Sequence, residues 1–431
     1  MARRQRSPIR DRLTTLITNA SIRSHASATG VVERNRKVDI VKFVWTLILG
    51  FSVDSKRTIA GLRRAFERAT GVHLVPSSFY DRFTPQLVKM LKMLVDDVMG
   101  DLIPATSNRD GVFAAFRDVL AADATVIRLH DMLAKGYAAC RTNHTKAAAK
   151  LHAVINVMGR GMEKIRLTDE RTKDGAVLKI GDWVVGKLLI FDLGYYKFQL
   201  FDRIDRRNGY FLSRLKETGN PLITSVHVGS GVGLVGEKLQ DVIGKLRRPV
   251  IDCEVQVRFQ RRVYRGKKTW ARASFRLVGI RNYLTKRYHL YLTNIPIETV
   301  EAAQIASLYA SRWSVELLFR ELKRSYRIDD LPSAKRQVVE SLIYASILTL
   351  AASRQLYKLI AQRRARSAGR MPEERWGIVF SSVALDVLLI LVGPREVGRV
   401  LGWRTIRYLL HESMDPNVGR RLLLDRVAEV A

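Results

Sequence analysis

The chain has 431 residues, of which 47% are hydrophobic, so it is long enough for two or three globular domains and too apolar for a disordered protein. Lysine and arginine total 74 against 41 acidic residues, a formal net charge of +33, which indicates a nucleic acid as partner, although a merely basic protein has the same composition. The two cysteines, Cys140 and Cys253, exclude a disulfide framework and a four-cysteine zinc site.

The first 110 residues divide into a basic stretch and a helical stretch. Residues 1–30 are rich in Ser, Thr and Arg, so we expect a basic, flexible arm. They begin with five arginines in MARRQRSPIRDR, but no apolar segment follows, so no signal peptide is predicted. Residues 31–110 are predicted to form a helical DNA-binding region, because segment 38–51 is mostly apolar and segment 55–71 spaces its apolar residues as helices do. Two helices joined by a short turn are typical of helix-turn-helix motifs and equally of unrelated bundles.

Residues 111–219 are predicted to form the first part of a mixed α/β core. Five segments are rich in β-branched and apolar residues, as strands are, and a helical segment at 197–209 precedes the fifth. Asp123 opens the first strand, and Asp192 ends the fourth just before a glycine-containing turn. The predicted strands are 123–130, 151–158, 163–169, 182–192 and 210–216.

Residues 220–295 are predicted to form a β-rich insertion. Two strand-like runs flank Gly266, which is typical of a hairpin. Between positions 258 and 276 there are eight Lys or Arg and no acid, interleaved with aromatic residues, which favours a surface that binds phosphates and stacks on bases. A sheet with one buried and one solvated face explains the aromatic residues equally well. The DNA-binding candidates here are Arg261, Arg262, Lys267, Lys268 and Trp270.

Helices are predicted from Pro296 to the end of the chain. Residues 296–335 would contain the second part of the core and one charged helix at 308–330, and residues 336–431 would form a helical C-terminal region. The apolar run 376–393 contains an aspartate and barely reaches the ~18 residues of a membrane span, so a buried core helix is the better interpretation.

The charged helix is predicted to present several functional groups on one face. At ~100° per residue, four of its polar side chains fall within an arc of roughly 60°, and a fifth lies beside them. Such a face could combine a metal-binding carboxylate with groups that bind phosphate. Surface salt bridges between side chains four residues apart explain the same spacing. The side chains are Tyr309, Arg312, Glu316 and Lys323, with Arg320 at the edge.

Three carboxylates are the candidate catalytic and metal-binding residues. Asp123 and Asp192 lie at strand ends, where an acid is more often a cap, and Glu316 lies in a helix, where a surface position is the default. Together they have another interpretation, because hard cations such as Mg²⁺ bind a few carboxylates plus substrate phosphate. Three acids can hold two metal ions roughly 3.5–4 Å apart for phosphoryl displacement.

The order of these segments resembles a DDE transposase of the insertion-sequence-four type. The signature of that branch, Tyr-x₂-Arg-x₃-Glu-x₆-Lys, matches YASRWSVELLFRELK without a gap. DATVIRL resembles the segment around the family's first aspartate, and FDLGYYKFQLFDRIDRRNGYFLSRLK resembles the segment around the second. The resemblance covers residues 31–360.

The resemblance implies a fold and a reaction. The fold would be an RNase H-like catalytic core, interrupted between Asp192 and Glu316 by the mostly β insertion. With Asp123, these acids would hold two Mg²⁺ ions, for which Mn²⁺ can substitute. Water would cleave the inverted-repeat ends of an insertion sequence, and the freed 3′-OH ends would attack target DNA, a cut-and-paste reaction.

The resemblance also implies partners. Tyr309, Arg312 and Lys323 would position DNA phosphates, and a homodimer would act on paired ends, with the helices of the C-terminal region as a candidate dimerisation surface. Family members that cut through a DNA hairpin hold a flipped base on a Trp just before the signature helix. The corresponding RYHLYLTNIP has none, and Trp270 could substitute. We expect a cytoplasmic, nucleoid-associated bacterial protein without a membrane partner.

Two other functions remain open from the sequence. A two-metal nuclease without strand transfer needs the same three acids. A non-catalytic DNA-binding repressor of transposition needs none of them, so their joint presence argues against it. Three other polar residues near the proposed acids are interpreted as structural or surface groups: Asp131, His152 and Asp182.

Overall fold

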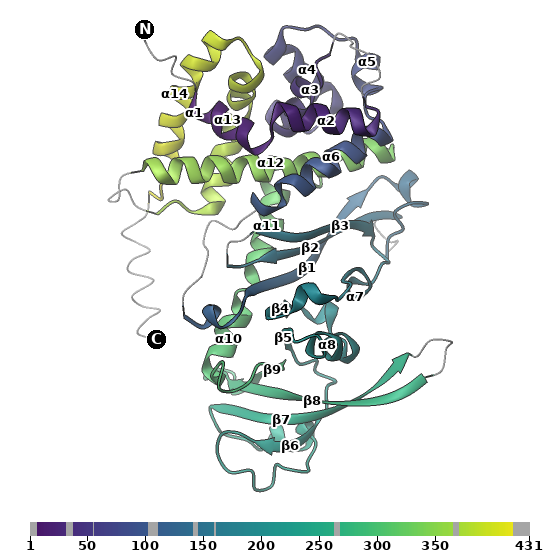
Figure 1. Ribbon diagram of the computed structural model, residues 1–431, viewed down its shortest axis with the longest axis vertical. Helices are drawn as coiled ribbons and strands as arrows, with labels where there is room; N and C mark the ends of the chain where they lie inside the picture. Colours follow the sequence, from purple (N-terminus) through teal and green to yellow (C-terminus); the bar gives the residue numbers. More distant parts are fainter. Residues whose placement is uncertain are drawn as a thin grey trace. The chain divides into compact units, whose positions relative to one another are not determined.

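The computed structural model describes residues 7–31, 38–54, 56–101, 111–140, 145–158, 161–262, 268–364 and 370–416. The chain divides into two compact units. The first, here the helical unit, comprises Met1–Ala105, Ile127–Ala149 and Leu318–Ala431, and the second, here the sheet unit, comprises Thr106–Val126 and Lys150–Leu317. Figure 1 labels most of the helices and strands.

The N-terminal segment is helical, which corrects the expectation of a flexible arm at 1–30. Residues 8–29 form two helices, the first of which begins with Pro8 and buries Ile9 and Leu13. The hydroxyl of Thr18 caps the second helix by accepting from the Ser21 N–H at 3.0 Å. Residues 1–6 lie outside the described part. The N-terminal helices are α1 (Pro8–Leu16), α2 (Asn19–Thr29), α3 (Ile40–Leu49), α4 (Ile59–Thr70), α5 (Pro76–Tyr80) and α6 (Pro85–Val98).

Capping residues fix where the next helices begin and end, and they confirm the helices predicted at 38–51 and 55–71. The Asp39 carboxylate accepts from the Val41 N–H at 2.8 Å at the start of α3. The Thr58 hydroxyl does the same for α4, which ends at Gly71 in the left-handed conformation with φ 71°. Local sequence therefore sets these helix ends.

Three long helices form the C-terminal region: α12 (Arg336–Arg363), α13 (Glu373–Val392) and α14 (Arg395–Glu412). Within the described residues, α13 alone is long and apolar enough to cross a membrane by length and composition, a test that core helices of soluble proteins also pass. Of its most apolar 18-residue window, 56% is buried inside the structure. Trp376 and Phe380 are fully buried, as expected of a core helix.

The strands form one nine-stranded sheet in the order β3-β2-β1-β4-β5-β9-β8-β7-β6 (Figure 1). Pairs β1–β4 and β4–β5 are parallel, whereas β5–β9, β9–β8, β8–β7 and β7–β6 are antiparallel. The mixed α/β class is therefore confirmed, and the strands of the predicted insertion continue the same sheet through the β5–β9 pair. The bounds are β1 (Asp118–Leu129), β2 (Ala147–Asn156), β3 (Gly161–Asp169), β4 (Lys187–Phe191), β5 (Tyr210–Arg214), β6 (Leu222–Val226), β7 (Val250–Arg262), β8 (Lys268–Arg281) and β9 (Tyr288–Thr293).

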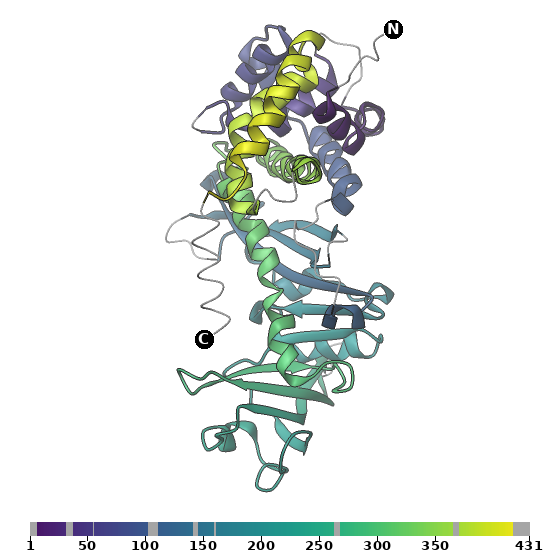
Figure 2. The same ribbon diagram turned by 90° about the vertical axis from the view of Figure 1, so that its left-hand side faces the viewer.

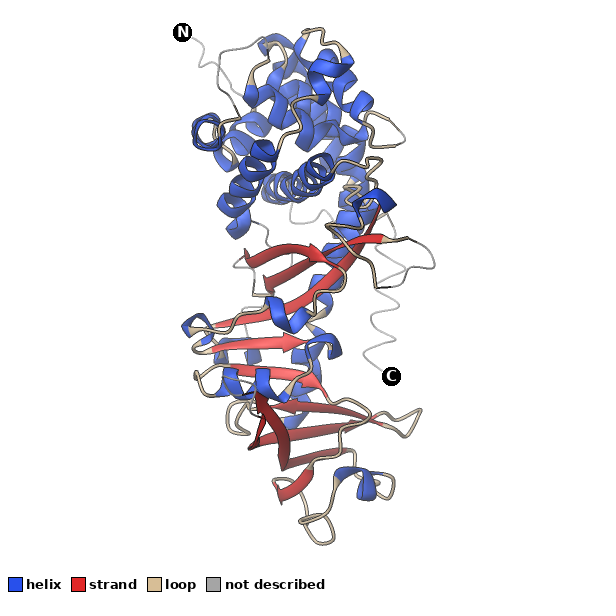
Figure 3. Ribbon diagram, turned by 90° about the vertical axis from the view of Figure 1, so that its right-hand side faces the viewer, coloured by secondary structure: helices blue, strands red, loops and turns tan. Residues whose placement is uncertain are grey.

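Helices cover both faces of the sheet within the sheet unit. Helix α10 (Ala302–Ala310) lies over one face (Figure 2), and α8 (Phe198–Asp205) lies over the other (Figure 3). On the α8 side, the rings of Phe201 and Phe211 stack with centroids 4.3 Å apart. On the α10 side, Tyr309 packs on Tyr291 of β9 with centroids 5.3 Å apart. One helix therefore covers each face of this part of the sheet. The unit also contains the short helices α7 (Asp174–Val177) and α9 (Leu239–Ile243).

A buried ion pair ties the outer strands to the chain that follows β9. Asp252 is 0% and Arg276 2% exposed. The guanidinium donates to both carboxylate oxygens, at 2.8 and 2.6 Å, and to the carbonyl of Val300 at 2.7 Å. Each charge of the pair is therefore balanced by the other, and both carboxylate oxygens of Asp252 accept a hydrogen bond from Arg276.

Replacing Arg276 with Met should lower the free energy of unfolding by about 3–5 kcal/mol, because Asp252 is left buried without a counter-charge. Urea denaturation measures the loss. Arg258→Met, which removes an exposed arginine from β7, should cost under about 1 kcal/mol. The double variant Arg276→Met with Asp252→Leu should recover most of the loss, and a double variant no better than Arg276→Met would contradict this account.

Candidate active site

The register of β1 and β4 brings two carboxylates together. The last paired residues are Ala122 and Phe191 on parallel neighbouring strands, so Asp123 and Asp192 follow at the same level. Asp192 keeps an extended backbone, with φ −76° and ψ 165°, as it leaves β4. Residues at one level of adjacent strands point to the same face, and their strands lie ~4.8 Å apart. Asp123 lies within β1, not at its opening as predicted, because β1 begins at Asp118.

The segment 308–330 is broken, which corrects the prediction of one continuous helix. Helix α10 ends at Ala310, and α11 (Trp313–Arg324) begins after a tight turn. Across the turn the hydrogen bonds span three residues and not four: the Arg312 N–H donates to the Tyr309 carbonyl at 3.1 Å, and the Val315 N–H to the Arg312 carbonyl at 3.2 Å. Arg312 therefore occupies the turn, and Glu316 lies in the first turn of α11.

Arg312 joins two of the three carboxylates. Its Nη1 lies 3.4 Å from Oδ2 of Asp123, and its Nη2 donates to Oε1 of Glu316. The side chains are 11% exposed for Arg312, 19% for Asp123 and 31% for Glu316. Nε of Arg312 is buried without a hydrogen-bond partner in the described part of the chain. The predicted salt bridge between Arg312 and Glu316 is thus present, but inside an acidic site and not on the surface.

The third carboxylate, Asp192, acts electrostatically on both Asp123 and Arg312. Burial, helped by the charges of Asp192 and Glu316, raises the pKa of Asp123 to about 6, although the hydrogen bond from the Ala124 N–H at 2.7 Å and the charge of Arg312 act in the opposite direction. Burial lowers the pKa of Arg312, but its contact with Glu316 and the charge of Asp192 raise it overall. The three acids and one guanidinium therefore form one electrostatic cluster.

Oxygen donors of this kind fit a divalent cation. Asp123, Asp192 and Glu316 offer only carboxylate oxygens, the ligands that Mg²⁺ prefers. Among the described residues, no three acidic, histidine or cysteine side chains lie close enough to form a metal-binding group as they stand. Arg312 takes up one oxygen of Asp123 and one of Glu316. The donor set is therefore chemically suitable for such a cation, with Arg312 holding two of the carboxylates.

Two further groups lie beside the cluster. The Tyr309 hydroxyl is buried without a partner among the described residues, and burial raises its pKa. Arg214 at the end of β5 pairs in register with Tyr291, and its charge acts on both Tyr291 and Tyr309. Arg214 is exposed. Sequence reasoning missed it, although the basic end of FLSRLK was a signal.

The remaining candidates of the signature segment lie farther along α11. Arg320 pairs with Glu374 of α13 at 3.0 Å. The alternative interpretation of the spacing, a salt bridge between side chains four residues apart, would instead have paired Arg320 with Glu316. Lys323 lies half-buried in the last turn of α11. Both belong to the part of α11 in the helical unit.

The basic hairpin predicted around Gly266 is confirmed by the register of β7 with β8. Trp270 is 58% exposed, and the guanidinium carbon of Arg258 lies 4.2 Å from its ring centroid. Three other candidates, Arg261, Arg262 and Lys268, lie on the paired strands, and their side chains are outside the described part. Lys267 lies outside the described residues.

The three polar residues that were interpreted as structural or surface groups have partners within the protein. His152 is buried with Nε2 2.9 Å from Oγ1 of Thr168, and burial lowers its pKa to about 4. Asp131 accepts from the Lys146 N–H at 2.7 Å. Asp182 is 91% exposed and pairs with Arg207.

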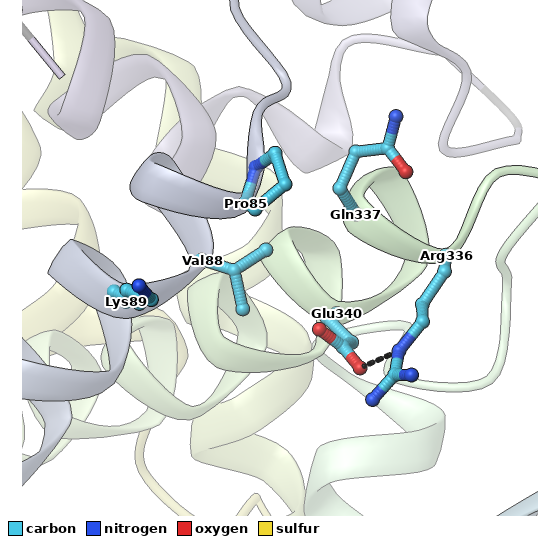
Figure 4. A pocket seen from close by; sticks show the side chains of 6 residues that line it. All are labelled: Pro85, Val88, Lys89, Arg336, Gln337 and Glu340. Atoms are coloured by element: carbon cyan, nitrogen blue, oxygen red, sulfur yellow. Dashed lines mark hydrogen bonds and ion pairs between the residues drawn. The ribbon is translucent and has the colours of Figure 1, made fainter. Parts of the chain in front are cut away.

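A cavity of about 340 Å³ lies in the helical unit, between α6 and α12 (Figure 4). Arg336 and Glu340 form an ion pair at 2.7 Å along its wall. None of its lining residues belongs to the carboxylate cluster. They are Pro85, Val88, Lys89, Arg336, Gln337 and Glu340.

Known proteins resemble the chain over most of its length. It is 25% identical over 384 residues to the transposase for insertion sequence element IS231E of Bacillus thuringiensis subsp. finitimus, covering 77% of this chain and 76% of that protein. It is 22% identical over 432 residues to the transposase for insertion sequence element IS231B of Bacillus thuringiensis subsp. berliner, covering 89% and 87%.

A shorter match links the chain to the transposase for insertion sequence element IS1151 of Clostridium perfringens, 24% identical over 191 residues, covering 38% of this chain and 40% of that protein. The family model of the transposase DDE domain matches residues 114–351. That match spans more than half of the chain and contains Asp123, Asp192 and Glu316. The chain therefore belongs to the DDE transposases of the insertion-sequence type.

Proposed function

We propose that the chain binds the inverted-repeat ends of an insertion sequence, cleaves them by two-metal phosphodiester hydrolysis and transfers the 3′-OH ends to target DNA. The observation that carries the proposal is that Arg312 contacts both Asp123 and Glu316, while the register of β1 and β4 sets Asp192 at the level of Asp123. In this proposal the strands β3-β2-β1-β4-β5 with α8 are an RNase H-like core. Strands β6–β9 are the insertion into it.

Asp123, Asp192 and Glu316 would hold two Mg²⁺ ions, with Mn²⁺ able to substitute. When bound, the metal supplies activation of the attacking oxygen and charge stabilisation for the leaving oxygen. The chain contributes the placement of the ligands. The parallel register sets the two aspartates at one level, and Glu316 in the first turn of α11 would complete the ligand set once Arg312 releases its carboxylate.

The groups around the acids would hold the DNA backbone. The Tyr309 hydroxyl and the Arg312 Nε are buried donors without partners among the described residues, and the exposed Arg214 adds a cation beside them. Lys323 would extend these phosphate contacts along α11. On the hairpin, the exposed ring of Trp270 would stack on an unpaired base.

The proposal includes a homodimeric partner and can be compared with two alternative functions. We propose a homodimer on paired ends, formed through the C-terminal helices, in the bacterial cytoplasm on the nucleoid. A nuclease without strand transfer would share the acids, and the transposase names of the relatives favour strand transfer. A repressor without catalysis would have no use for three converging carboxylates.

Asp123→Ala, Asp192→Ala and Glu316→Ala should each abolish Mg²⁺-dependent cleavage while leaving DNA binding intact, because each removes negative charge that would hold the metal. Cleavage activity is measured on a duplex taken from the DNA that flanks the coding sequence, and DNA binding is measured by gel retardation. Asp182→Ala is the matched control, since that side chain is 91% exposed, and it should cleave normally.

Cleavage at the normal rate by any of the three variants would remove that residue from the site. Cut ends without integrated product, with target DNA present, would favour the nuclease.

Arg214→Ala should weaken DNA binding and make its salt dependence shallower, reducing the slope of log K against log salt by about 1, as loss of one phosphate contact does. Arg206→Ala removes an exposed arginine of the same unit that is already paired with Asp202 at 3.0 Å, and it should change the slope less. Equal slopes for Arg214→Ala and the unaltered protein would show that Arg214 meets no phosphate.

Asp123→Asn should stabilise the metal-free protein at neutral pH. Burial raises the pKa of Asp123 from 3.8 to about 6, so above pH 6 the folded chain carries a buried charge that the unfolded chain solvates freely. The advantage of the variant is absent below about pH 4, grows from there to about pH 6, and then stays at about 1–3 kcal/mol.

Urea denaturation at several pH values measures that advantage. Asp182→Asn should show no such pH dependence. A difference between Asp123→Asn and the unaltered protein that does not change with pH would contradict the raised pKa.

A further inference from the structure

We propose that Arg312 couples metal binding to DNA binding: its guanidinium holds the carboxylates of Asp123 and Glu316 until a DNA phosphate draws it away, and the metal site is complete only then. This rests on the proposed function, because it assigns a regulatory role to a residue of the same site. The consequence is that phosphodiester chemistry is confined to the DNA complex.

The contacts of Arg312 make it a competitor for the metal ligands. Nη1 lies 3.4 Å from Oδ2 of Asp123, and Nη2 donates to Oε1 of Glu316. A metal ion bound between these two carboxylates would use the same oxygens. The two cations also repel each other, and the half-buried setting screens that repulsion only partly.

Arg312 is also incompletely satisfied where it lies. Its Nε is buried without a partner in the described part, and its contact with Asp123 is long for a charge-assisted hydrogen bond. Such an arginine gains from exchanging a carboxylate for a phosphate, which it can grip with two parallel hydrogen bonds.

The neighbours of Arg312 show where that phosphate would bind. The guanidinium carbon lies 5.8 Å from the Tyr309 ring centroid, and the Tyr309 hydroxyl has no partner among the described residues. The charge of Arg214 acts on the same tyrosine. A phosphate received by Tyr309 and Arg214 would therefore attract the guanidinium away from the acids.

Coupling of this kind is reciprocal. If DNA raises the affinity for metal by some factor, metal must raise the affinity for DNA by the same factor. The part of that factor that depends on Arg312 can be isolated, because it disappears when the guanidinium is removed.

The first arm of the experiment measures Mn²⁺ binding to the full chain without DNA, by the electron paramagnetic resonance of free Mn²⁺. Arg312→Gln should bind Mn²⁺ about tenfold more tightly than the unaltered protein, a difference of ~1.4 kcal/mol. Arg206→Gln, which breaks another arginine–carboxylate pair four residues apart, should leave the affinity unchanged. Equal or weaker binding by Arg312→Gln would overturn the proposal.

The second arm repeats the titration with a saturating duplex taken from the DNA that flanks the coding sequence. That duplex should tighten Mn²⁺ binding to the unaltered protein more than to Arg312→Gln. The factor by which DNA tightens Mn²⁺ binding should be about ten times larger for the unaltered protein than for Arg312→Gln, which matches the tenfold gain of the first arm. The same tightening in both proteins would overturn the coupling.

Further variants separate the possible failures. Glu316→Gln should lose the Mn²⁺ site, and if it binds Mn²⁺ normally the proposed metal site itself is wrong. If Glu316→Gln loses the site while Arg312→Gln is unchanged, only the coupling is wrong. Arg312→Lys keeps the charge but not the two-oxygen grip, so it should give an intermediate affinity, which tests the proposal even where Arg312→Gln fails to fold.

Discussion

The parallel pairing of β1 with β4 is the constraint on which the site depends. Because Ala122 pairs with Phe191, Asp123 within β1 and Asp192 just after β4 lie at one level and on one face. Burial disfavours the charged form of Asp123, and the neighbouring charge of Asp192 adds to that cost. The sheet core supplies the stability that tolerates this arrangement, and the raised pKa of Asp123 is its electrostatic consequence.

The guanidinium of Arg312, which lies in the turn between α10 and α11, compensates the negative charge of these carboxylates. A continuous helix would place Arg312 and Glu316 one turn apart on a uniform surface. The three-residue hydrogen bonds tighten the backbone at Arg312, so its guanidinium reaches both Glu316 of its own helix and Asp123 of the sheet. The break in the helix thus belongs to the electrostatics of the site and is not an irregularity of the connection.

Much of this was predictable from local sequence, and the rest depends on tertiary contacts. Capped helices such as α3 and strands such as β5 follow from hydrophobic periodicity. Helices α1 and α2 were missed because their few apolar residues, Ile9 among them, are buried only through contacts with distant helices such as α12. The break at Arg312 carries no glycine or proline. Arg214 reaches Tyr309 only through the β5–β9 pairing, which no short motif encodes.

Arginine is the residue that the geometry of position 312 requires. Two carboxylates of different elements must be held by one side chain, and a planar guanidinium offers separate nitrogens for Asp123 and Glu316 while lysine offers a single point of charge. The same planar group also suits a phosphate. One side chain can therefore neutralise the acids in one state and bind the DNA backbone in another, with no change in its own protonation. If the site contained the acids without the arginine, the carboxylates would repel one another whenever no metal ion was bound, and the metal-free protein would be less stable.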